Sequence, residues 1–330
     1  MAEPLLSVRG LKTYFKTDRG WVHAVDDVSF DIAPATIVGL VGESGSGKSV
    51  TGLSILGLVP CPPGQYAGGE IHWKGVNLLA LPPEAMRKCR GAEIAMIFQE
   101  PMTSLNPVMR VGDQVAEALE VHTDLDRAGR RARVVELLGE VGIASPEERY
   151  DQYPNQLSGG MRQRVMIAMA LACDPALLIA DEPTTALDVT IQAQILDLLR
   201  KLTGKHRTSV LLVTHDLGVV AELTTEVLVM YAGQIVEKGP TERVVGDPRH
   251  PYTAGLLASL PQVGLAAHRS RLQAIPGLVP ELVEPEPGCR FADRCTRAAP
   301  RCRVEDPVLA PAGEGRLAAC FFPLGQGADQ

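Results

Sequence analysis

The segment Gly42–Ser49 has the residue types and the spacing of a loop that binds nucleotide phosphates, GxxxxGK[ST]. It follows a run typical of a buried strand and precedes a run with helical spacing. Its glycines let backbone N–H groups curl around phosphate oxygens, and the positive end of the next helix adds to this attraction. Lys48 supplies a charge for the β- and γ-phosphates, and the Ser49 hydroxyl is placed to bind Mg²⁺. A chance match in such a chain is on the order of one in a hundred. We therefore predict nucleotide contacts from Gly42, Ser44, Gly45, Ser46, Gly47, Lys48 and Ser49.

Two adjacent carboxylates, Asp181 and Glu182, follow the apolar run Leu177–Ala180. A buried strand would place Asp181 at the carboxyl edge of an α/β sheet, where ligands bind, and there it can hold Mg²⁺ through water. Glu182 would point to the opposite side of the chain and reach a water in line with the γ-phosphate. The alternative is a solvated acid at a strand end. The phosphate loop favours catalysis.

Gln99 and His215 also end strand-like runs, Ile94–Phe98 and Val210–Val213. Such residues are more often structural, because buried polar groups need hydrogen-bond partners. Here both runs belong to the sheet whose carboxyl edge carries the phosphates. We therefore expect both side chains to contact the γ-phosphate, with Gln99 also a ligand of Mg²⁺.

The elements that must position these residues belong to the α/β class, in which apolar strands alternate with helices. Buried strands of a mostly parallel sheet are expected at Val38–Gly42, Ile94–Phe98, Ala176–Ala180 and Ser209–Val213. Helical spacing appears at Leu53–Leu58, Val115–Leu119, Val134–Val141 and Ile191–Leu202. Half-exposed antiparallel strands are indicated at Ser7–Arg9, Val28–Ile32 and Glu70–Trp73. The stretch from about Met102 to Asn155 carries no strand pattern and predicts a helical insertion.

Composition excludes several classes of protein. The 330 residues suggest about two structural units, and the 39 acidic against 32 basic side chains give a net charge of −7, which argues against a cationic face for nucleic acid. The longest uncharged apolar stretch, Val165–Cys173, falls far short of the roughly 20 residues that span a bilayer. The first residues lack the pattern of an export signal, so we expect a cytoplasmic chain without a disulfide framework.

The segment Leu157–Met161, with the sequence LSGGM, precedes a helical run shortly before the two carboxylates. Ser-Gly-Gly at a helix N-terminus is an anion site without a lysine. A chain with a complete phosphate loop has no local use for a second one. The segment resembles the LSGGQ signature of ATP-binding-cassette (ABC) ATPases. This resemblance implies that two cassettes pair head to tail, with the signature of one closing over the nucleotide of the other.

The resemblance covers roughly residues 5–240 and implies the fold of an ABC-type P-loop ATPase. That fold has an antiparallel β subdomain, a helical subdomain (here about 100–158) and, in this chain, a small Cys- and Pro-rich C-terminal extension. It implies a nucleotide-binding domain at 1–240 and a C-terminal region at 241–330. Met161 stands where the commonest signature has Gln, and we expect no loss of hydrolysis because that position is peripheral to the serine and glycine contacts.

The resemblance also implies the role of each matched residue. The matched residues are the Walker A loop Gly42–Ser49, the Q-loop Gln99, the signature residues Ser158, Gly159 and Gly160, the Walker B pair Asp181 and Glu182, and the switch His215. Ala186–Asp188 matches the D-loop, which implies that Asp188 lies near the partner's site. Phe15 matches the aromatic residue that stacks on adenine, with Tyr14 as the alternative.

Further segments narrow the resemblance to the ATPase subunits of dipeptide and oligopeptide importers. They are Gln99–Pro107, Ser158–Arg164, His250–Thr253 and the cysteine tail. Importers of nickel, glutathione and some sugars share this subgroup. The resemblance implies two transmembrane permease subunits, a second related ATPase or another copy of this chain, an external solute-binding protein, and a peripheral location at the cytoplasmic face of the bacterial inner membrane.

Two other functions compete with that of an importer ATPase. A soluble cassette ATPase acting on nucleic acid or ribosomes would need two cassettes, a long coiled-coil insert or a basic face. A nucleotide switch that does not hydrolyse ATP is disfavoured by the intact pair Asp181 and Glu182 and by His215.

Four cysteines, Cys289, Cys295, Cys302 and Cys320, lie in a tail that starts near Pro240 and holds 12 of the 25 prolines. A short segment with little core of its own often needs a metal staple. Four thiolates suit Zn²⁺ or an iron–sulfur cluster, and the Cys-x₂₋₄-Cys pairs typical of structural zinc are missing from the sequence. The resemblance favours a [4Fe–4S] cluster, because some members of the subgroup carry one in this tail. No metal is the second interpretation and zinc the third.

Overall fold

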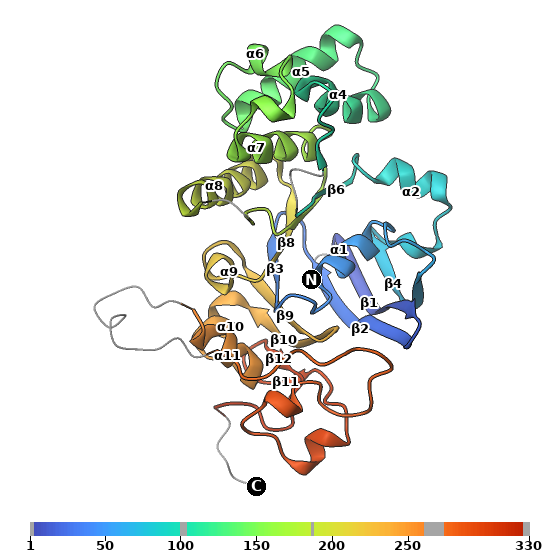
Figure 1. The fold of residues 1–330 in the computed structure, drawn as a ribbon, viewed down its shortest axis with the longest axis vertical. Coiled ribbons are helices and arrows are strands. Elements are labelled where there is room, and N and C mark those ends of the chain that lie inside the picture. Colours follow the sequence, from blue (N-terminus) through green and yellow to red (C-terminus); the bar gives the residue numbers. More distant parts are fainter. Residues whose placement is uncertain (1–2, 100–103, 186–187, 261–273, 326–330) are drawn as a thin grey trace, which may run out of the picture. The chain divides into compact units, whose positions relative to one another are not determined.

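The computed structural model describes residues 3–99, 104–185, 188–260 and 274–325. The chain forms two compact units (Figure 1). Unit 1 comprises Met1–Ile32, Ile37–Leu79 and Val213–Gln330, and unit 2 comprises Ala33–Thr36 and Ala80–Leu212. In the described part of the chain, no helix combines the length and the apolar character needed to cross a bilayer.

Unit 1 contains an antiparallel sheet with the strand order β2-β1-β4-β5. Its strands are β1 Leu6–Thr17, β2 Gly20–Ile32, β4 Gly64–Trp73 and β5 Val76–Asn77. Leu6 and Val8 are fully buried while Ser7 between them is not, as expected of strands with one covered face. The predicted antiparallel subdomain is confirmed.

A second sheet in unit 1 carries the phosphate loop. In it β3 Ile37–Val41 pairs in parallel with β9 Glu226–Tyr231, and β9 pairs antiparallel with β10 Gln234–Pro240. The short strands β12 Leu317–Ala318 and β11 Ala310–Pro311 extend this sheet beyond β10. The helices of unit 1 are α1 Lys48–Ile55, α9 Leu217–Leu223, α10 Thr241–Gly246 and α11 Pro251–Ala258. The predicted helix at Leu53–Leu58 therefore starts and ends earlier than its apolar pattern, because the loop glycines, not the apolar residues, set its first turn.

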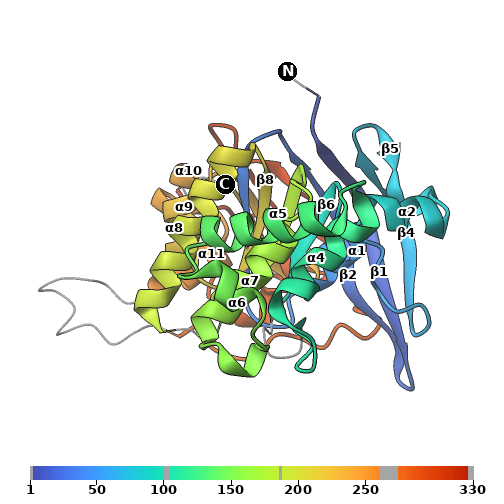
Figure 2. The same cartoon turned by 90° about the horizontal axis from the view of Figure 1, so that it is seen from above.

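Unit 2 combines strands with a group of helices. β6 Ile94–Ile97 and β7 Leu177–Asp181 pair in parallel, and β8 Ser209–Thr214 is next to β7 in strand order. The helices are α2 Pro83–Cys89, α4 Val111–His122, α5 Arg127–Glu140, α6 Pro146–Tyr150, α7 Gly159–Ala170 and α8 Val189–His206. Figure 2 shows α4, α5, α6 and α7 gathered together, and their contacts confirm the predicted helical insertion.

The C-terminal tail shares the core of unit 1. Leu282 and Phe291 pack with Tyr231 of β9 and Tyr252 of α11 in one buried cluster. Besides α10, α11, β11 and β12, its described part contains two 3₁₀ turns, Ala292–Arg294 and Pro300–Arg303. The tail therefore packs its apolar residues against one another and against β9 of the cassette, which explains how so proline-rich a segment is ordered. The boundary at residue 240 stays a prediction.

Candidate nucleotide site

The phosphate loop of unit 1 depends on glycine at two close approaches. A Cβ atom on Gly42 would lie 2.1 Å from the carbonyl oxygen of Met230, and one on Gly47 would lie 2.2 Å from that of Ala24. Gly47 also has a φ of +102° and forms the N-cap of α1. No side chain fits at either position, so the sequence GESGSGKS folds here as a tight loop that leads directly into a helix.

Lys48 is the cation of this loop. It is 5% exposed, and its Nζ donates hydrogen bonds to the carbonyl oxygens of Gly42 and Glu43, both at 2.8 Å. These bonds close the loop into a ring around the ammonium group. Ser49 follows in the first turn of α1. The arrangement is a preformed cradle for an anion, with a buried positive charge and a helix N-terminus at its base.

The two aromatic candidates on β1 have different surroundings. The Tyr14 ring stacks on His23 at 3.8 Å between centroids, and its hydroxyl donates to Asp26 at 2.7 Å. Burial and this carboxylate both raise the pKa of the Tyr14 hydroxyl. Phe15 is half-buried and contacts the region of Gly64, where a Cβ atom would come within 3.2 Å of its ring. One face of the Tyr14 ring is therefore covered by His23, and the choice of Phe15 over Tyr14 as the adenine platform stays a prediction.

In unit 2, two sequence-predicted catalytic residues meet. Ile97 of β6 pairs with Ala180 of β7, so the carboxyl ends of these strands lie side by side. The Nε2 group of Gln99 donates to Oε2 of Glu182 at 3.1 Å. Asp181 is the last residue of β7 and is 4% exposed. The parallel pairing of the strands thus explains why residues 83 positions apart share one hydrogen bond.

Glu182 is held in an unusual conformation. Its φ of +44° lies in the left-handed region, which is uncommon for residues other than glycine. The Thr185 hydroxyl donates to the same Oε2 atom at 2.8 Å. Thr185 is not among the residues predicted from the sequence, where the run Glu-Pro-Thr-Thr after the strand is its only local signal. Two donors and a strained backbone therefore fix the carboxylate in one orientation.

The signature segment forms the N-terminus of α7. Ser158 is the N-cap, and its hydroxyl accepts a hydrogen bond from the Met161 N–H at 3.4 Å. Ser158 and Gly159 are exposed, while Gly160 lies where a Cβ atom would come 3.0 Å from Ile191. The helix end therefore presents backbone N–H groups to solvent, as an anion site requires.

The remaining predicted positions lie at other helix starts. Asp188 is the exposed N-cap of α8, and its carboxylate accepts from the Ile191 N–H at 2.9 Å. His215 is exposed in unit 1, immediately before the N-cap Asp216 of α9. Ala186 and Leu187 of the predicted D-loop, and residues 100–103 of the run Gln99–Pro107, lie outside the described residues.

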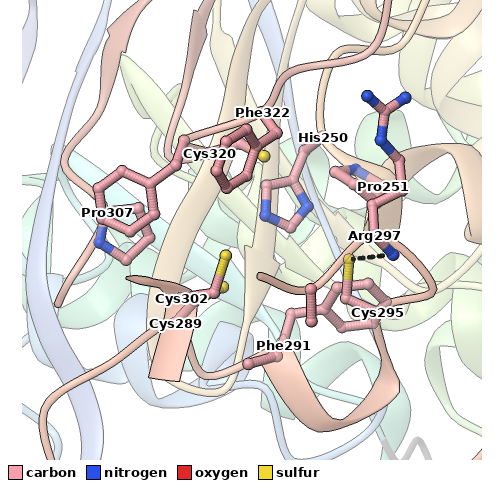
Figure 3. Close-up of a pocket in the computed structure, with 13 residues that line it drawn as sticks. His250, Pro251, Cys289, Phe291, Cys295, Arg297, Cys302, Pro307, Cys320 and Phe322 are labelled. Atoms are coloured by element: carbon pink, nitrogen blue, oxygen red, sulfur yellow. Dashed lines mark hydrogen bonds between the residues drawn. The ribbon is translucent and has the colours of Figure 1, made fainter. Parts of the chain in front are cut away.

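The four tail cysteines line one pocket, together with His250, Phe291, Phe321 and Phe322 (Figure 3). The cavity between these side chains is small, with a volume of about 20 Å³. Burial raises the pKa of Cys289 to about 11 and also raises the pKa values of Cys295 and Cys320. Within residues 3–99, 104–185, 188–260 and 274–325, no three His, Cys, Asp or Glu side chains are close enough to hold a single metal ion. The four thiols thus share a pocket without forming a ready-made metal site in this part of the chain.

Comparisons with known proteins agree with this geometry. Residues 25–185 match the family model for the ABC transporter, and residues 236–302 match that for the oligopeptide/dipeptide transporter, C-terminal region. A protein of Brucella ovis, named a peptide import ATP-binding protein, is 52% identical over 97% of both chains. A peptide ABC transporter ATP-binding protein of Sinorhizobium fredii is 52% identical over 97% of this chain and 95% of its own.

Solved structures with the same fold are also ABC cassettes. The cassette MJ0796, determined as a dimer bound to ADP and Pi after hydrolysis, has a TM-score of 0.63 and 28% identity, and covers 72% of this chain and 98% of its own. The protein cbiO1 of Clostridium perfringens, part of the ABC transporter complex cbiONQ, has a TM-score of 0.64 and 26% identity over 74% of this chain and 92% of its own. The chain therefore belongs to the ABC transporter family, among its ATP-binding proteins with an oligopeptide/dipeptide transporter C-terminal region.

Proposed function

We propose that this protein hydrolyses ATP to drive the import of di- and oligopeptides through partner permease subunits. The relatives named for peptide import share about half of its residues over nearly the whole chain, including the tail. The match of residues 236–302 to the peptide transporter C-terminal region supports the same substrate class. Nickel, glutathione and sugars are the other cargoes that the test below distinguishes.

The hydrolytic part of the proposal depends chiefly on the Gln99–Glu182–Thr185 arrangement. ATP is bound by the phosphate loop through Lys48, with Phe15 stacked on the adenine. Glu182 accepts a proton from, or orients, the attacking water, and its two hydrogen-bond donors keep the carboxylate aimed in one direction. His215 steadies the γ-phosphate.

Mg²⁺ is the metal that the family implies for this reaction. Ser49, Gln99 and Asp181 offer hydroxyl, amide and carboxylate oxygens, which are the hard donors that Mg²⁺ prefers. When bound there, Mg²⁺ neutralises charge on the β- and γ-phosphates. Two local positions support the assignment: Asp181 is the last residue of β7, and Ser49 lies in the first turn of α1.

A second ATPase subunit, either this chain or a related one, completes the site. In the proposed head-to-tail pair, the exposed Ser158–Gly160 helix end of one subunit meets the γ-phosphate held by the other, with Asp188 near the interface. Only a nucleotide that binds the closed pair better than the open one drives closure.

We place the complex at the cytoplasmic face of the bacterial inner membrane, with two permeases and an external solute-binding protein. We also propose the division into a cassette at 1–240 and a C-terminal region at 241–330.

The cysteine pocket is proposed to hold a [4Fe–4S] cluster. A four-iron cluster takes one thiolate per iron, so its ligands surround a volume rather than converge on one point. The backbone N–H of Arg297 donates to Cys295 Sγ at 3.4 Å, and hydrogen bonds from the backbone of Phe291 and Phe322 favour the thiolates of Cys289 and Cys320. When bound, such a cluster supplies four covalent anchors to the tail.

Reconstitution tests both the reaction and the cargo. The full chain, its partner ATPase and two permeases are placed in liposomes with the solute-binding protein, and uptake of labelled tripeptide, Ni²⁺, glutathione and a disaccharide is measured with and without ATP. ATP-dependent uptake of the peptide alone is expected. Uptake of another cargo instead would overturn the peptide assignment. ATPase activity stimulated by RNA or ribosomes rather than by permeases would overturn the importer function.

Iron analysis and visible absorption after anaerobic purification test the cluster, and a colourless, iron-free protein refutes it.

A further inference from the structure

A buried arginine of the tail forms an ion pair with the phosphate loop. Arg294 is 6% exposed and forms a two-pronged ion pair with Glu43, the second residue of the loop. Its Nη1 lies 2.5 Å from Oε2 and its Nη2 lies 2.9 Å from Oε1. The Nε group donates to the carbonyl of Pro276 at 2.9 Å, which fixes the plane of the guanidinium. Bidentate pairing of this kind specifies geometry as well as attraction.

A second tail arginine reaches the other side of the loop. Arg290 donates to the Ala232 carbonyl at 2.5 Å and forms an ion pair with Asp26. Ala232 begins the tight turn after β9, and the next residue, Gly233, donates its N–H to the carbonyl of Ser46 at 2.9 Å. Arg290 thus holds the turn that hydrogen-bonds to the middle of the phosphate loop.

Tyr252 of α11 provides a third contact. It is fully buried, and its hydroxyl oxygen accepts the Glu43 N–H at 2.9 Å. Its ring lies 4.6 Å from that of Tyr231 and 5.4 Å from that of Phe291, between centroids. Glu43 is therefore fixed through its backbone by α11 and through its side chain by the tail.

All three contacts start next to the cysteine pocket. Arg290 follows Cys289, and Arg294 precedes Cys295, with a single 3₁₀ turn between them. Tyr252 follows His250 and Pro251, which line the same pocket. Each of the three side chains therefore belongs to a residue that directly adjoins a pocket-lining residue in the sequence. When the pocket-lining residue moves, its neighbour moves with it, and that neighbour contacts the phosphate loop or the turn that supports the loop.

We propose that Arg290, Arg294 and Tyr252 are positioning residues through which the cysteine pocket controls the shape of the phosphate loop and hence its affinity for nucleotide. This rests on the proposed ATP site but not on the identity of the cargo. The ordered pocket holds Glu43 and Ser46 in the nucleotide-binding shape, and a disturbed pocket releases them. Because linkage is reciprocal, nucleotide also stabilises the ordered pocket by the same factor.

The first test measures binding of MgADP to the full chain. This binding reports on the phosphate loop of one chain and does not depend on closure of the head-to-tail pair. Arg294→Met and Glu43→Gln are each expected to raise the Kd about tenfold or more, and the double variant should be no weaker than the worse single variant, because both remove one ion pair. Arg294→Lys should restore part of the affinity. Arg303→Met is the matched control, since Arg303 forms an exposed ion pair within the same tail, and its Kd should stay within twofold of the wild type.

Tyr252→Phe keeps the core filled and removes only the hydroxyl. This variant therefore tests the proposal even if Arg294→Met or Glu43→Gln fails to fold. We expect a Kd about threefold higher and a raised KM for ATP at constant kcat in the assembled transporter, with only a small drop in the melting temperature of the chain. A purely structural tail would lower melting temperatures and leave the Kd of the folded protein unchanged. Wild-type affinity in both Tyr252→Phe and folded Arg294→Met would overturn the proposal.

The link to the pocket itself is tested by Cys295→Ser. This variant should weaken MgADP binding as much as Arg294→Met does, and adding it to Arg294→Met should cause little further loss. Conversely, saturating MgADP should slow the reaction of the pocket thiols with a maleimide reagent, or the loss of iron to a chelator where iron is bound, in the wild type but not in Arg294→Met. If the effects of Cys295→Ser and Arg294→Met on the Kd of MgADP are additive, the proposed coupling between pocket and loop is refuted. If the coupling is as expected but the transporter does not take up peptide, only the proposed cargo is refuted.

Discussion

Replacing Glu182 by Gln is expected to separate nucleotide binding from hydrolysis. The carboxylate accepts two hydrogen bonds on a single oxygen, from Gln99 at 3.1 Å and from Thr185 at 2.8 Å. The amide oxygen of Gln can accept the same two bonds and occupies the same volume. The backbone at φ +44° bears the same strain with either side chain, which is about 1–3 kcal/mol for such a conformation. Fold and binding should therefore be retained.

The magnitude follows from what the substitution removes. Gln cannot accept a proton, and a positioned general base contributes about 10²- to 10⁴-fold, or about 3–5.5 kcal/mol of the activation free energy. The Kd for ATP should change by no more than about twofold, or about 0.4 kcal/mol. The variant should consequently accumulate ATP-bound, closed pairs that turn over very slowly.

The assay combines phosphate release at saturating ATP with size-exclusion chromatography of the nucleotide-bound protein. Glu222→Gln is the control, because Glu222 is an exposed acid on α9 and should retain normal turnover. If Glu182→Gln releases phosphate at more than a fifth of the wild-type rate, Glu182 is not the base. If it loses ATP binding as well, the carboxylate serves the structure of the site and the reasoning from its two donors is wrong.

Three further outcomes are expected. Gly47→Ala should abolish nucleotide binding, measured by calorimetry, because its Cβ would lie 2.2 Å from a backbone carbonyl oxygen of β2; binding within tenfold of the wild type would contradict this. Ser158→Ala removes the N-cap of α7 and should cost about 1 kcal/mol of unfolding free energy. It should also slow ATP turnover of the pair while MgADP binding to the single chain stays normal. Burial by itself would raise the pKa of Glu140, but Lys205 and Arg133 hold it below its ordinary value. The stability from Glu140 is therefore present above its unfolded pKa of about 4.3 and lost as pH falls through the lower folded pKa. Between pH 5 and pH 3 the wild type should lose more melting temperature than Glu140→Gln, and parallel curves would disprove the assignment.

Much of the site could be predicted because its signals are local. The loop Gly42–Ser49 needs glycine, lysine and serine at fixed spacing, whatever the rest of the chain does. Gln99 and Glu182 could be assigned to one edge because parallel strands end at the same edge of a sheet, and their hydrogen bond confirms it. The helical insertion followed from periodicity, although its helices extend past the apolar residues that indicated them.

Other features depended on which face of an element a residue occupies. Neighbours on a strand point to opposite sides, so Tyr14 and Phe15 look equivalent in sequence until their environments are known. The stack on His23 and the bond to Asp26 are features of Tyr14 that only the tertiary structure shows. The positive φ of Glu182 likewise has no signature in residue type, because it is imposed by the turn that follows β7.

The amino-acid sequence by itself determined the chemistry available to this protein: a phosphate cradle, an acid–amide pair at strand ends, a helix tip for a second anion contact and four thiols in a tail. Only the tertiary structure decided that the thiols share one pocket and that Arg294 pairs with Glu43, 251 positions away. Periodicity and turn preferences are set by neighbours along the chain, whereas the partner of a buried arginine is set by which segments pack together. No local pattern contains that information.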